Sequence, residues 1–442
     1  MTISTRKAHL PGKCHSSEQL DLFQHVLASY EAAGDQPLLN ADLYQAVARR
    51  AGVAATDANR TVEISGGQHS PFKRSVRWVQ QTMKHLGLLE RRPGQRGVWN
   101  LAQRNKDGLT SAPAGKRLVA FSTNLGIAIW GDSTRNFPQL GEPISLVVTS
   151  PPYLLRRPRA YGNPLTEQAY VDFICSALEP IVAQMAPGGS ICLNLTNDSF
   201  VPGSPARSVA KERLVLALVD RLGLELMDTL IWHNPSKPPG PIQYASKRRV
   251  QLNTSYEPVY WFTTDSSRVY SDNRRVLQPH SDRHKQWLRQ VQEAGACPRT
   301  GVYGDGAYRL RPSSYMNETE GRIPKNVLPI GHACADTRQY RRDAAGLGLP
   351  IHGAMMPLAL ARFLIEFLSL PGQLVLDLFG GTAKTAMAAE VLDRRWMIFE
   401  LFAEYLRGGA QRFQRMPGFQ IGKEFSLGFP GDRFKLQSWS AQ

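Results

Sequence analysis

The 442-residue chain lacks the features that define several large protein classes. Its five cysteines never form a C-x-x-C pair, so we expect neither a disulfide framework nor a zinc knuckle. No apolar run approaches the roughly 18 residues that a membrane span requires, and residues 1–7 carry no apolar segment of signal-peptide type. No H-E-x-x-H motif occurs, so no metal site is expected, and His233, His332 and His352 are predicted to be ordinary surface or core residues. These absences favour a cytoplasmic protein with reduced thiols.

Positive charge is in excess and unevenly distributed. The chain holds 53 Lys and Arg against 37 Asp and Glu, for a net charge of +16. Residues 1–117 hold 17 basic against 9 acidic side chains, residues 266–345 hold 14 against 8, and residues 118–265 are balanced at 12 against 12. Each Lys or Arg that meets a phosphate releases a condensed counterion, so two basic blocks favour a polyanion laid across two parts of the molecule. A basic surface that only improves solubility is the alternative.

The first basic block has the outline of a small helical domain. Apolar side chains recur at helical spacing over residues 39–50 and again over residues 72–86. Two short β-prone runs follow around the turn at residues 93–94, with arginines at the tip. A helix followed by a hairpin with a basic tip resembles the N-terminal winged-helix module of some restriction-related proteins. We expect residues 1–105 to form a mainly helical, winged-helix-like DNA-binding domain, with a docking or dimerising domain as the alternative.

Beyond a polar linker predicted at residues 106–117, short apolar runs alternate with longer helical stretches. Strands are predicted at residues 144–149, 190–195 and 374–377, and helices at residues 170–185 and 214–222. This alternation is typical of an α/β sheet. Residues 266–349 are rich in arginine and aromatic residues but show little periodicity. We expect this region to be inserted into the sheet or appended to it.

The segment Thr149-Ser150-Pro151-Pro152-Tyr153 directly follows an apolar strand. Two prolines remove two backbone donors and fix φ, so the carbonyls of Ser150 and Pro151 can point into a cleft. A hydroxyl, bare carbonyls and an aromatic ring at the carboxyl end of a strand suit a planar group that bears an amine. Tyr153 would stack on this group, while Ser150 Oγ and a carbonyl would accept the amine hydrogens and turn the nitrogen lone pair toward an electrophile. A stiff turn without function is the alternative.

A second pattern extends from Val375 to Thr385. A strand that ends at Asp377 runs into Gly380-Gly381, and a helix follows. About 20 residues later, a second strand ends at Glu400. In dinucleotide-binding folds, glycines let a ligand approach the backbone closely, and the acid at the end of the second strand accepts hydrogen bonds from ribose hydroxyls. A tight packing turn without a ligand is the alternative.

Together, the two segments resemble the β group of S-adenosylmethionine-dependent DNA amino-methyltransferases, in which the catalytic motif precedes the cofactor motif. The resemblance implies a Rossmann-like α/β sheet with circularly permuted motif order, a catalytic half at residues 118–265, a target-recognition region at 266–349 and a cofactor-binding half at 350–442. It assigns catalysis to Ser150, Pro151, Pro152 and Tyr153. It assigns the binding of S-adenosylmethionine to Asp132, Asp377, Phe379, Gly380, Gly381, Thr382 and Glu400. Residues 230–235 resemble a segment near the target pocket, and residues 352–357 one that leads into the cofactor helix.

The chain departs from the family pattern at three positions of the second segment. Leu378 replaces a usual proline, and Ala383 and Lys384 replace a usual glycine and threonine. We expect the Lys384 side chain to point into solvent. No Pro-Cys pair occurs, which argues against the ring-carbon cytosine methyltransferases, because their nucleophile is a cysteine in such a pair.

The combined interpretation is a site-specific DNA methyltransferase that acts on the 4-amino group of a cytosine flipped out of duplex DNA. A serine at the start of the catalytic motif favours cytosine, whereas adenine enzymes more often begin this motif with Asp or Asn. Adenine-N6 methylation, an RNA substrate and a noncatalytic DNA-binding regulator on the same fold are the alternatives. Double-stranded DNA is the expected partner, together with a separately encoded endonuclease of a restriction-modification system, and no membrane partner or metal is expected.

Overall fold

The structure is a computed structural model. It describes residues 22, 25–26, 28–30, 32–33, 36–64, 67–85, 89–92, 94–101, 109–113, 115–154, 166–295, 302–303, 308–309, 319–422 and 425. Within these ranges, no helix is both long enough and apolar enough to cross a membrane.

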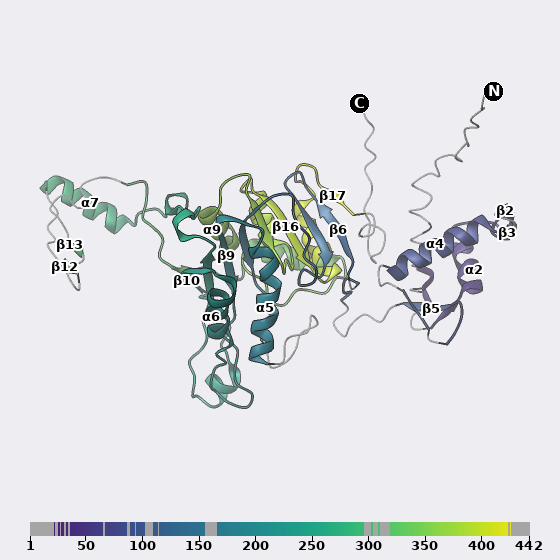
Figure 1. Cartoon of the computed structure of the whole chain (residues 1–442), viewed down its shortest axis with the longest axis horizontal. Coiled ribbons are helices and arrows are strands. Elements are labelled where there is room, and N and C mark those ends of the chain that lie inside the picture. Colours follow the sequence, from purple (N-terminus) through teal and green to yellow (C-terminus); the bar gives the residue numbers. More distant parts are fainter. Residues whose placement is uncertain are drawn as a thin grey trace, which may run out of the picture.

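The N-terminal part is a small unit of helices and short strands (Figure 1). Its elements are β1 (Leu38–Leu39), α2 (Asn40–Arg50), α3 (Ala55–Asn59), β2 (Val62–Ile64), β3 (Gly67–His69), α4 (Pro71–His85), β4 (Leu89–Arg91) and β5 (Val98–Leu101). Strands β1, β5 and β4 form an antiparallel sheet. Val76, Val79 and Met83 of α4 are buried with Leu43 and Trp99, because the apolar face of α4 packs on this sheet and on α2. The two predicted helices and the predicted hairpin are confirmed.

The rest of the chain is organised around one ten-stranded sheet with the order β14-β10-β11-β9-β8-β15-β16-β7-β6-β17. Its strands are β6 (Arg117–Ser122), β7 (Gly126–Gly131), β8 (Ile144–Thr149), β9 (Met185–Asn194), β10 (Glu225–His233), β11 (Tyr256–Thr263), β14 (Val327–Pro329), β15 (Leu374–Asp377), β16 (Arg395–Glu400) and β17 (Gln420–Ile421). The neighbours β9, β8, β15, β16 and β7 run parallel, whereas β11 and β6 are antiparallel to their neighbours. The predicted α/β class is confirmed as a mixed, mostly parallel sheet.

Helices cover both faces of this sheet. α5 (Glu167–Val182) and α6 (Ala210–Leu222) pack in one apolar cluster with Val147 and Leu376. α9 (Leu358–Leu368), α10 (Lys384–Glu390) and α11 (Ala403–Ala410) pack in another with Leu146 and Val375. Because successive side chains of a strand point to opposite faces, the fully apolar strands β8 and β15 serve both clusters at once.

The two predicted motifs meet at the centre of the sheet. β8 and β15 are parallel neighbours, although Thr149 and Asp377 at their carboxyl ends are 228 residues apart in sequence. From β8 the chain continues to β9 on one side, and from β15 it continues to β16 on the other side. Such a reversal leaves a crevice outside the carboxyl ends of the two strands, which is where ligands bind in open α/β sheets.

Part of the predicted linker packs against the large sheet unit. Thr110 donates from N and Oγ1 to the buried carboxylate of Glu404, each at 2.8 Å. Leu109 is buried with Phe402 and Tyr405. The described residues 109–113 are therefore held against α11, because the buried carboxylate of Glu404 requires hydrogen-bond donors and Thr110 supplies two of them. Residues 102–108 lie outside the described part of the chain.

Much of the predicted recognition region is built into the fold. It contains η2 (Ser266–Arg268), η3 (Asn273–Val276), α7 (Asp282–Ala294), β12 (Val302–Tyr303), β13 (Tyr308–Arg309), β14 and α8 (Ala335–Gly346). β14 extends the sheet beside β10, η3 lies against α9, and α8 lies against α11. In Figure 1, α7 and the hairpin β12–β13 stand apart from the sheet. The remaining short helices are η1 (Ile242–Lys247) and η4 (Gln411–Phe413).

Because β7 and β16 pair closely, we expect that adding one methyl group at Gly126 destabilises the fold. A Cβ added to Gly126 would lie 2.1 Å from the carbonyl oxygen of Trp396. Since backbone must shift to admit it, we expect Gly126→Ala to lower the free energy of unfolding by about 1–3 kcal/mol. The measurement is urea denaturation followed by circular dichroism.

Gly141→Ala is the matched control, because a Cβ at Gly141 would meet no heavy atom within 4 Å. Its effect should stay within about 0.5 kcal/mol. Equal unfolding midpoints for the two variants would show that the pairing of β7 and β16 is not as tight as described.

Candidate active site

A cavity of about 470 Å³ opens at the carboxyl ends of β8 and β15. All eleven residues predicted for catalysis and cofactor binding line it: Asp132, Ser150, Pro151, Pro152, Tyr153, Asp377, Phe379, Gly380, Gly381, Thr382 and Glu400. The fold thus brings both motifs into one space. Its size is within the usual range for small-molecule sites, about 300–1,000 Å³.

Asp377 joins the two motifs. Its Oδ1 accepts hydrogen bonds from Thr149 Oγ1 at 2.6 Å and from the Phe379 amide at 3.0 Å, and its Oδ2 accepts from Thr385 Oγ1 at 2.7 Å. Burial raises the pKa of this carboxyl, although the three donors oppose the shift. Both oxygens are therefore already engaged within the protein, and Asp377 holds β8, the glycine turn and α10 in register.

The glycine turn brings backbone to the floor of the cavity. Gly380 donates to the carbonyl of Phe399 at 2.7 Å, and a Cβ there would lie 3.0 Å from Ile398 Cβ. Gly381 has φ +50°, and Ala383 is left-handed at φ 61°. A non-glycine residue pays roughly 1–2 kcal/mol for this conformation. Ala383 thus has a left-handed backbone, the conformation that favours glycine.

Glu400 ends β16 beside this turn and is 8% exposed. The Gly381 amide donates to its Oε2 at 2.7 Å, and the Phe402 amide donates to its Oε1 at 2.9 Å. Burial raises the pKa of Glu400 to about 7, and the two amides oppose that shift. Each carboxylate oxygen has two lone pairs, so the side chain can still accept hydrogen bonds from a ligand in the cavity.

The predicted exposure of Lys384 is wrong. Its side chain is 4% exposed and lines the cavity. Nζ donates to Thr337 Oγ1 at 2.6 Å and lies 3.3 Å from Asp336 Oδ2. Burial lowers the pKa of Lys384, while Asp336 opposes the shift. The motif itself contains no sign of this contact, because both partners come from the start of α8.

Asp336 is shared by a second cation. Arg412 Nε lies 2.8 Å from Asp336 Oδ1, and the same guanidinium donates to the carbonyl of Thr382 in the glycine turn. Arg412 is 8% exposed and Asp336 17% exposed. A buried ionic cluster therefore connects α8, the start of α10 and η4 to the floor of the cavity.

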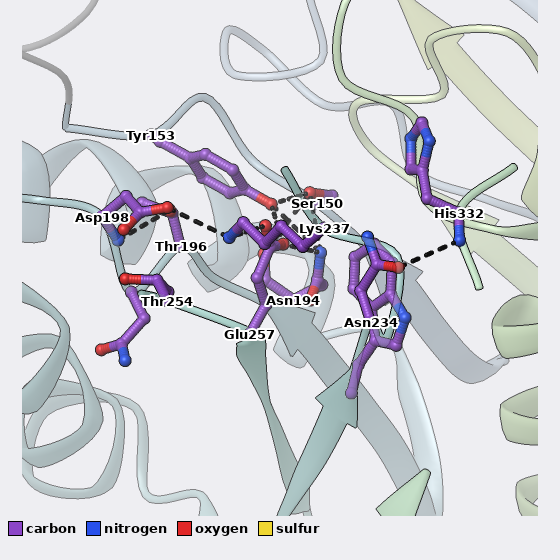
Figure 2. A network of polar contacts seen from close by, with 12 residues as sticks. Ser150, Tyr153, Asn194, Thr196, Asp198, Asn234, Lys237, Thr254, Glu257 and His332 are labelled. Atoms are coloured by element: carbon purple, nitrogen blue, oxygen red, sulfur yellow. Dashed lines mark hydrogen bonds and ion pairs between the residues drawn. The ribbon is translucent and has the colours of Figure 1, made fainter. Parts of the chain in front are cut away.

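Ser150 and Tyr153 belong to a network of polar side chains at the Ser-Pro-Pro-Tyr end of the cavity (Figure 2). Ser150 Oγ lies 2.9 Å from Tyr153 Oη. Tyr153 Oη donates to Glu257 Oε2 at 3.1 Å, and Asn194 Nδ2 donates to Tyr153 Oη at 3.1 Å and to Glu257 Oε2 at 3.2 Å. The tyrosine hydroxyl is therefore held in place by three partners.

Glu257 connects this network to two further charges. Lys237 Nζ lies 3.7 Å from Glu257 Oε1 and 3.0 Å from Asp198 Oδ2, and Figure 2 shows it between the two carboxylates. Burial raises the pKa of Glu257, and Lys237 is the largest influence in the opposite direction. The glutamate thus lies in a charged environment, unlike Asp377.

Four residues of this network were not predicted: Asn194, Asp198, Lys237 and Glu257. Asn194 ends β9, and Glu257 lies near the start of the antiparallel strand β11. Both therefore lie at the same edge of the sheet as Ser150. Two signals in the sequence were available. Asn194 is a polar residue at the end of an apolar run, and Glu257 is the one acidic residue within the apolar run of β11. Only strand order shows that they meet.

Two histidines also line the cavity, His332 and His352, which the sequence analysis did not place there. The His332 amide lies 3.4 Å from Asn234 Oδ1, and burial, followed by the charge of Lys384, lowers the pKa of its ring. The His352 ring contacts the Tyr405 ring edge-on, at 4.4 Å between centroids. In the described ranges, no group of three or more His, Cys, Asp and Glu side chains could hold a metal ion.

The predicted element around Asp132 forms another wall. Ser133 Oγ donates to the Leu378 carbonyl at 2.7 Å, which fixes this wall to the glycine turn. Asp132 Oδ1 accepts from the Thr134 amide and from its hydroxyl, at 2.9 and 2.6 Å. Leu378, which replaces a usual proline, is buried in the core. Ala354, Met355 and Met356 of the stretch 352–357, together with Trp232, line the cavity as well.

A mostly parallel sheet, a glycine turn after its central strand and a Ser-Pro-Pro-Tyr segment after the neighbouring strand define the class of DNA methylases. Residues 144–411 match the model of the DNA methylase family, and the chain belongs to that family. Residues 21–111 match the model of the Mrr N-terminal domain. The resemblance expected from the sequence is thereby confirmed.

The chain is also similar to individual methyltransferases and to their solved structures. The type II methyltransferase M.PvuII of Proteus hauseri is 34% identical over 297 residues, which cover 66% of this chain and 85% of the relative. The solved structure of the cytosine-N4-specific PvuII DNA methyltransferase superposes with a TM-score of 0.51 at 30% identity, over 68% of this chain and 89% of that chain. The M1.HpyAVI–SAM complex is 15% identical, with a TM-score of 0.38 over 64% of this chain and 97% of that chain.

The ionic cluster of Asp336, Lys384 and Arg412 predicts which of two variants is less stable. Asp336→Asn leaves two buried cations without their shared carboxylate, so we expect a loss of about 3–5 kcal/mol in the free energy of unfolding. Lys384→Met removes one cation and leaves the Arg412–Asp336 pair intact, so its loss should be clearly smaller. Urea denaturation at pH 7 measures both.

Asp282→Asn is the control for the change of Asp to Asn, because that side chain is fully exposed on α7 and its change should stay within about 0.5 kcal/mol. An equal or larger loss for Lys384→Met than for Asp336→Asn would contradict the shared role of Asp336.

Proposed function

We propose that this DNA methylase transfers a methyl group from S-adenosylmethionine to the 4-amino group of a cytosine flipped out of duplex DNA. The observation that carries the proposal is the single cavity that holds both Ser150 of the Ser-Pro-Pro-Tyr segment and the glycine turn with Glu400. The relation to M.PvuII, named for cytosine N4 in its solved structure, supports the choice of cytosine over adenine.

The residues around the glycine turn fit the cofactor. Gly380 and Gly381 leave backbone exposed to a ligand, and Glu400 keeps lone pairs for ribose hydroxyls. Asp132 and Phe379 line the same part of the cavity. When bound, S-adenosylmethionine supplies a methyl group that carries the electrophilic character of a sulfonium. Asp377 supports the site indirectly, since its oxygens are engaged with Thr149, Phe379 and Thr385.

The catalytic end of the cavity acts on the target amine by position. The cytosine 4-amino group is paired and stacked within the duplex, so the base must be flipped out to reach the residues of the cavity. Ser150 Oγ can accept one amine hydrogen, and a carbonyl of the Pro-Pro turn can accept the other. Such an orientation turns the nitrogen lone pair toward the methyl donor. Tyr153 is fixed at the cavity wall through its hydroxyl and offers a ring for stacking.

The experiment that tests the function uses purified protein, unmodified duplex DNA and S-adenosylmethionine labelled in its methyl group. After digestion to nucleosides, mass spectrometry identifies the labelled base. We expect 4-methylcytosine. Label in 6-methyladenine would keep the mechanism and overturn the choice of base, while label in RNA but not in DNA would overturn the substrate. Absence of transfer despite DNA binding would favour the noncatalytic regulator.

We further propose that the two basic parts of the chain contact the duplex. α4 exposes Arg74, Arg77 and Lys84, and the hairpin β4–β5 exposes Arg92 and Arg96. Such side chains suit phosphates on either side of a recognition helix. Residues 1–105 would then act as a winged-helix DNA-binding domain, and the region within 266–349 that carries α7 would read the site in the major groove. A separately encoded endonuclease would complete the restriction-modification system.

Glu400 predicts how cofactor binding depends on pH. Ribose hydroxyls donate to the ionised carboxylate, and the pKa of Glu400 is raised to about 7. Affinity for S-adenosylhomocysteine should therefore rise about tenfold between pH 6 and pH 8 and then level off. Isothermal titration calorimetry measures it. Because the folded pKa exceeds the unfolded value, this carboxyl makes the free protein less stable, not more stable, as pH rises from about 4.5 to about 7.

Glu400→Gln should bind the ligand more weakly and with no such pH dependence. Glu142→Gln is the matched control, since Glu142 pairs with Arg395 at the opposite edge of the sheet, and it should keep the wild-type profile. An affinity of the wild-type protein that does not change between pH 6 and pH 8 would contradict the assignment of Glu400 to the ribose.

A further inference from the structure

Ser150, Tyr153 and Glu257 form a chain of hydrogen bonds with a defined direction. An ionised carboxylate only accepts, so Tyr153 Oη gives its proton to Glu257 Oε2, at 3.1 Å. Burial, followed by the charge of Glu257, raises the pKa of Tyr153 well above its usual range, which keeps the phenol protonated. The tyrosine oxygen then accepts from Ser150, at 2.9 Å, and from Asn194.

The direction of this chain decides what Ser150 offers to a substrate. Its proton points to Tyr153, and Asn194 Nδ2 lies 3.5 Å from Ser150 Oγ, so one lone pair of Ser150 Oγ remains for a donor in the cavity. An amine is such a donor. The negative charge of Glu257, two hydrogen bonds away, thus makes Ser150 an acceptor rather than a donor.

We propose that Ser150, Tyr153 and Glu257 form a proton relay that carries the proton released by the target amine onto the carboxylate of Glu257. The inference rests on the proposed function and extends it to residues that neither motif contains. Glu257 lines the cavity but need not touch the amine, since the two hydroxyls connect them.

The step balances. A bond forms between the amine nitrogen and the methyl carbon, and the bond from that carbon to sulfur breaks with its electron pair left on sulfur. The nitrogen then gives one proton to Ser150 Oγ, Ser150 gives its own proton to Tyr153 Oη, and Tyr153 gives its own to Glu257. Each hydroxyl ends with one proton, and Glu257 ends neutral.

The surroundings of Glu257 suit a proton acceptor. Lys237 after β10 favours its ionised form, and Asp198 after β9 opposes it; Asn194 and Tyr153 donate to it. Burial raises its pKa, which brings a glutamate closer to the working pH of a general base. The Lys237 side chain is 21% exposed, so the proton can leave Glu257 toward solvent on that side.

The test measures single-turnover methylation of duplex DNA against pH with saturating S-adenosylmethionine. The wild-type rate should rise through the titration of Glu257 and then level off. Glu257→Gln should lower the plateau rate about 100-fold, within the range for general bases, and abolish the rise. Tyr153→Phe keeps the ring but breaks the relay, so it should show a similar loss with unchanged DNA affinity.

A double mutant and a charge variant separate a relay from a purely structural role. Residues that act as a unit are not additive, so Glu257→Gln with Tyr153→Phe should be no slower than the slower single variant. Lys237→Met removes the cation that favours ionised Glu257, so the rise should move to higher pH. A structural role predicts neither result. Glu142→Gln, remote from the cavity, is the control and should match the wild type.

The outcomes distinguish the relay from the proposed function. If the wild-type protein methylates no base, both fall. If it methylates DNA while Glu257→Gln keeps the wild-type rate and pH profile, the relay is wrong and the function stands. Additive losses in the double mutant, or an unmoved rise in Lys237→Met, would also overturn the relay. Thermal unfolding of each variant shows that the fold is retained.

Discussion

The site depends on one buried carboxylate. Asp377 accepts from Thr149 on β8, from the backbone of the glycine turn, and from Thr385 on α10. A buried carboxylate without these donors would be costly, so the three elements are held together by the need to satisfy it. The Ser-Pro-Pro-Tyr segment directly follows Thr149, and the segment that forms the glycine turn directly follows Asp377. Their relative position is therefore set by hydrogen bonds of about 2.6–3.0 Å.

Three acids around the cavity differ because their surroundings differ. Both carboxylate oxygens of Asp377 accept hydrogen bonds within the protein, and these bonds hold β8, the glycine turn and α10 together. Glu400 receives two amides and retains capacity for a ligand, as a ribose-binding acid requires. Glu257 lies beside a lysine and a second carboxylate, and a hydrogen-bond chain links it to Ser150. Burial raises the pKa of all three, but their hydrogen-bond and charged partners differ, and the proposed roles follow from those partners.

The structure shows how the residues that depart from the family motif are accommodated. Ala383, in place of a usual glycine, has a left-handed backbone, which is the conformation that favours glycine. Lys384, in place of a threonine, is buried against Asp336 and Thr337. Its charge is balanced from α8, which the sequence pattern did not connect to the cofactor motif. The region predicted to be an insert thus contributes to the floor of the cavity, and the substitution and its partner are parts of one arrangement.

The sequence by itself determined the α/β class, the strands at β8 and β15, and the N-terminal helices and hairpin. It also determined eleven of the residues that line the cavity. Each of these predictions depends on local periodicity or on a short sequence motif. Only the tertiary structure decided that Asn194, Lys237 and Glu257 join Ser150, and that Lys384 is buried. Those contacts arise from strand order and helix packing between segments far apart in the chain. A local sequence pattern cannot predict these contacts, because the partners of a side chain depend on which helices and strands become neighbours in the fold.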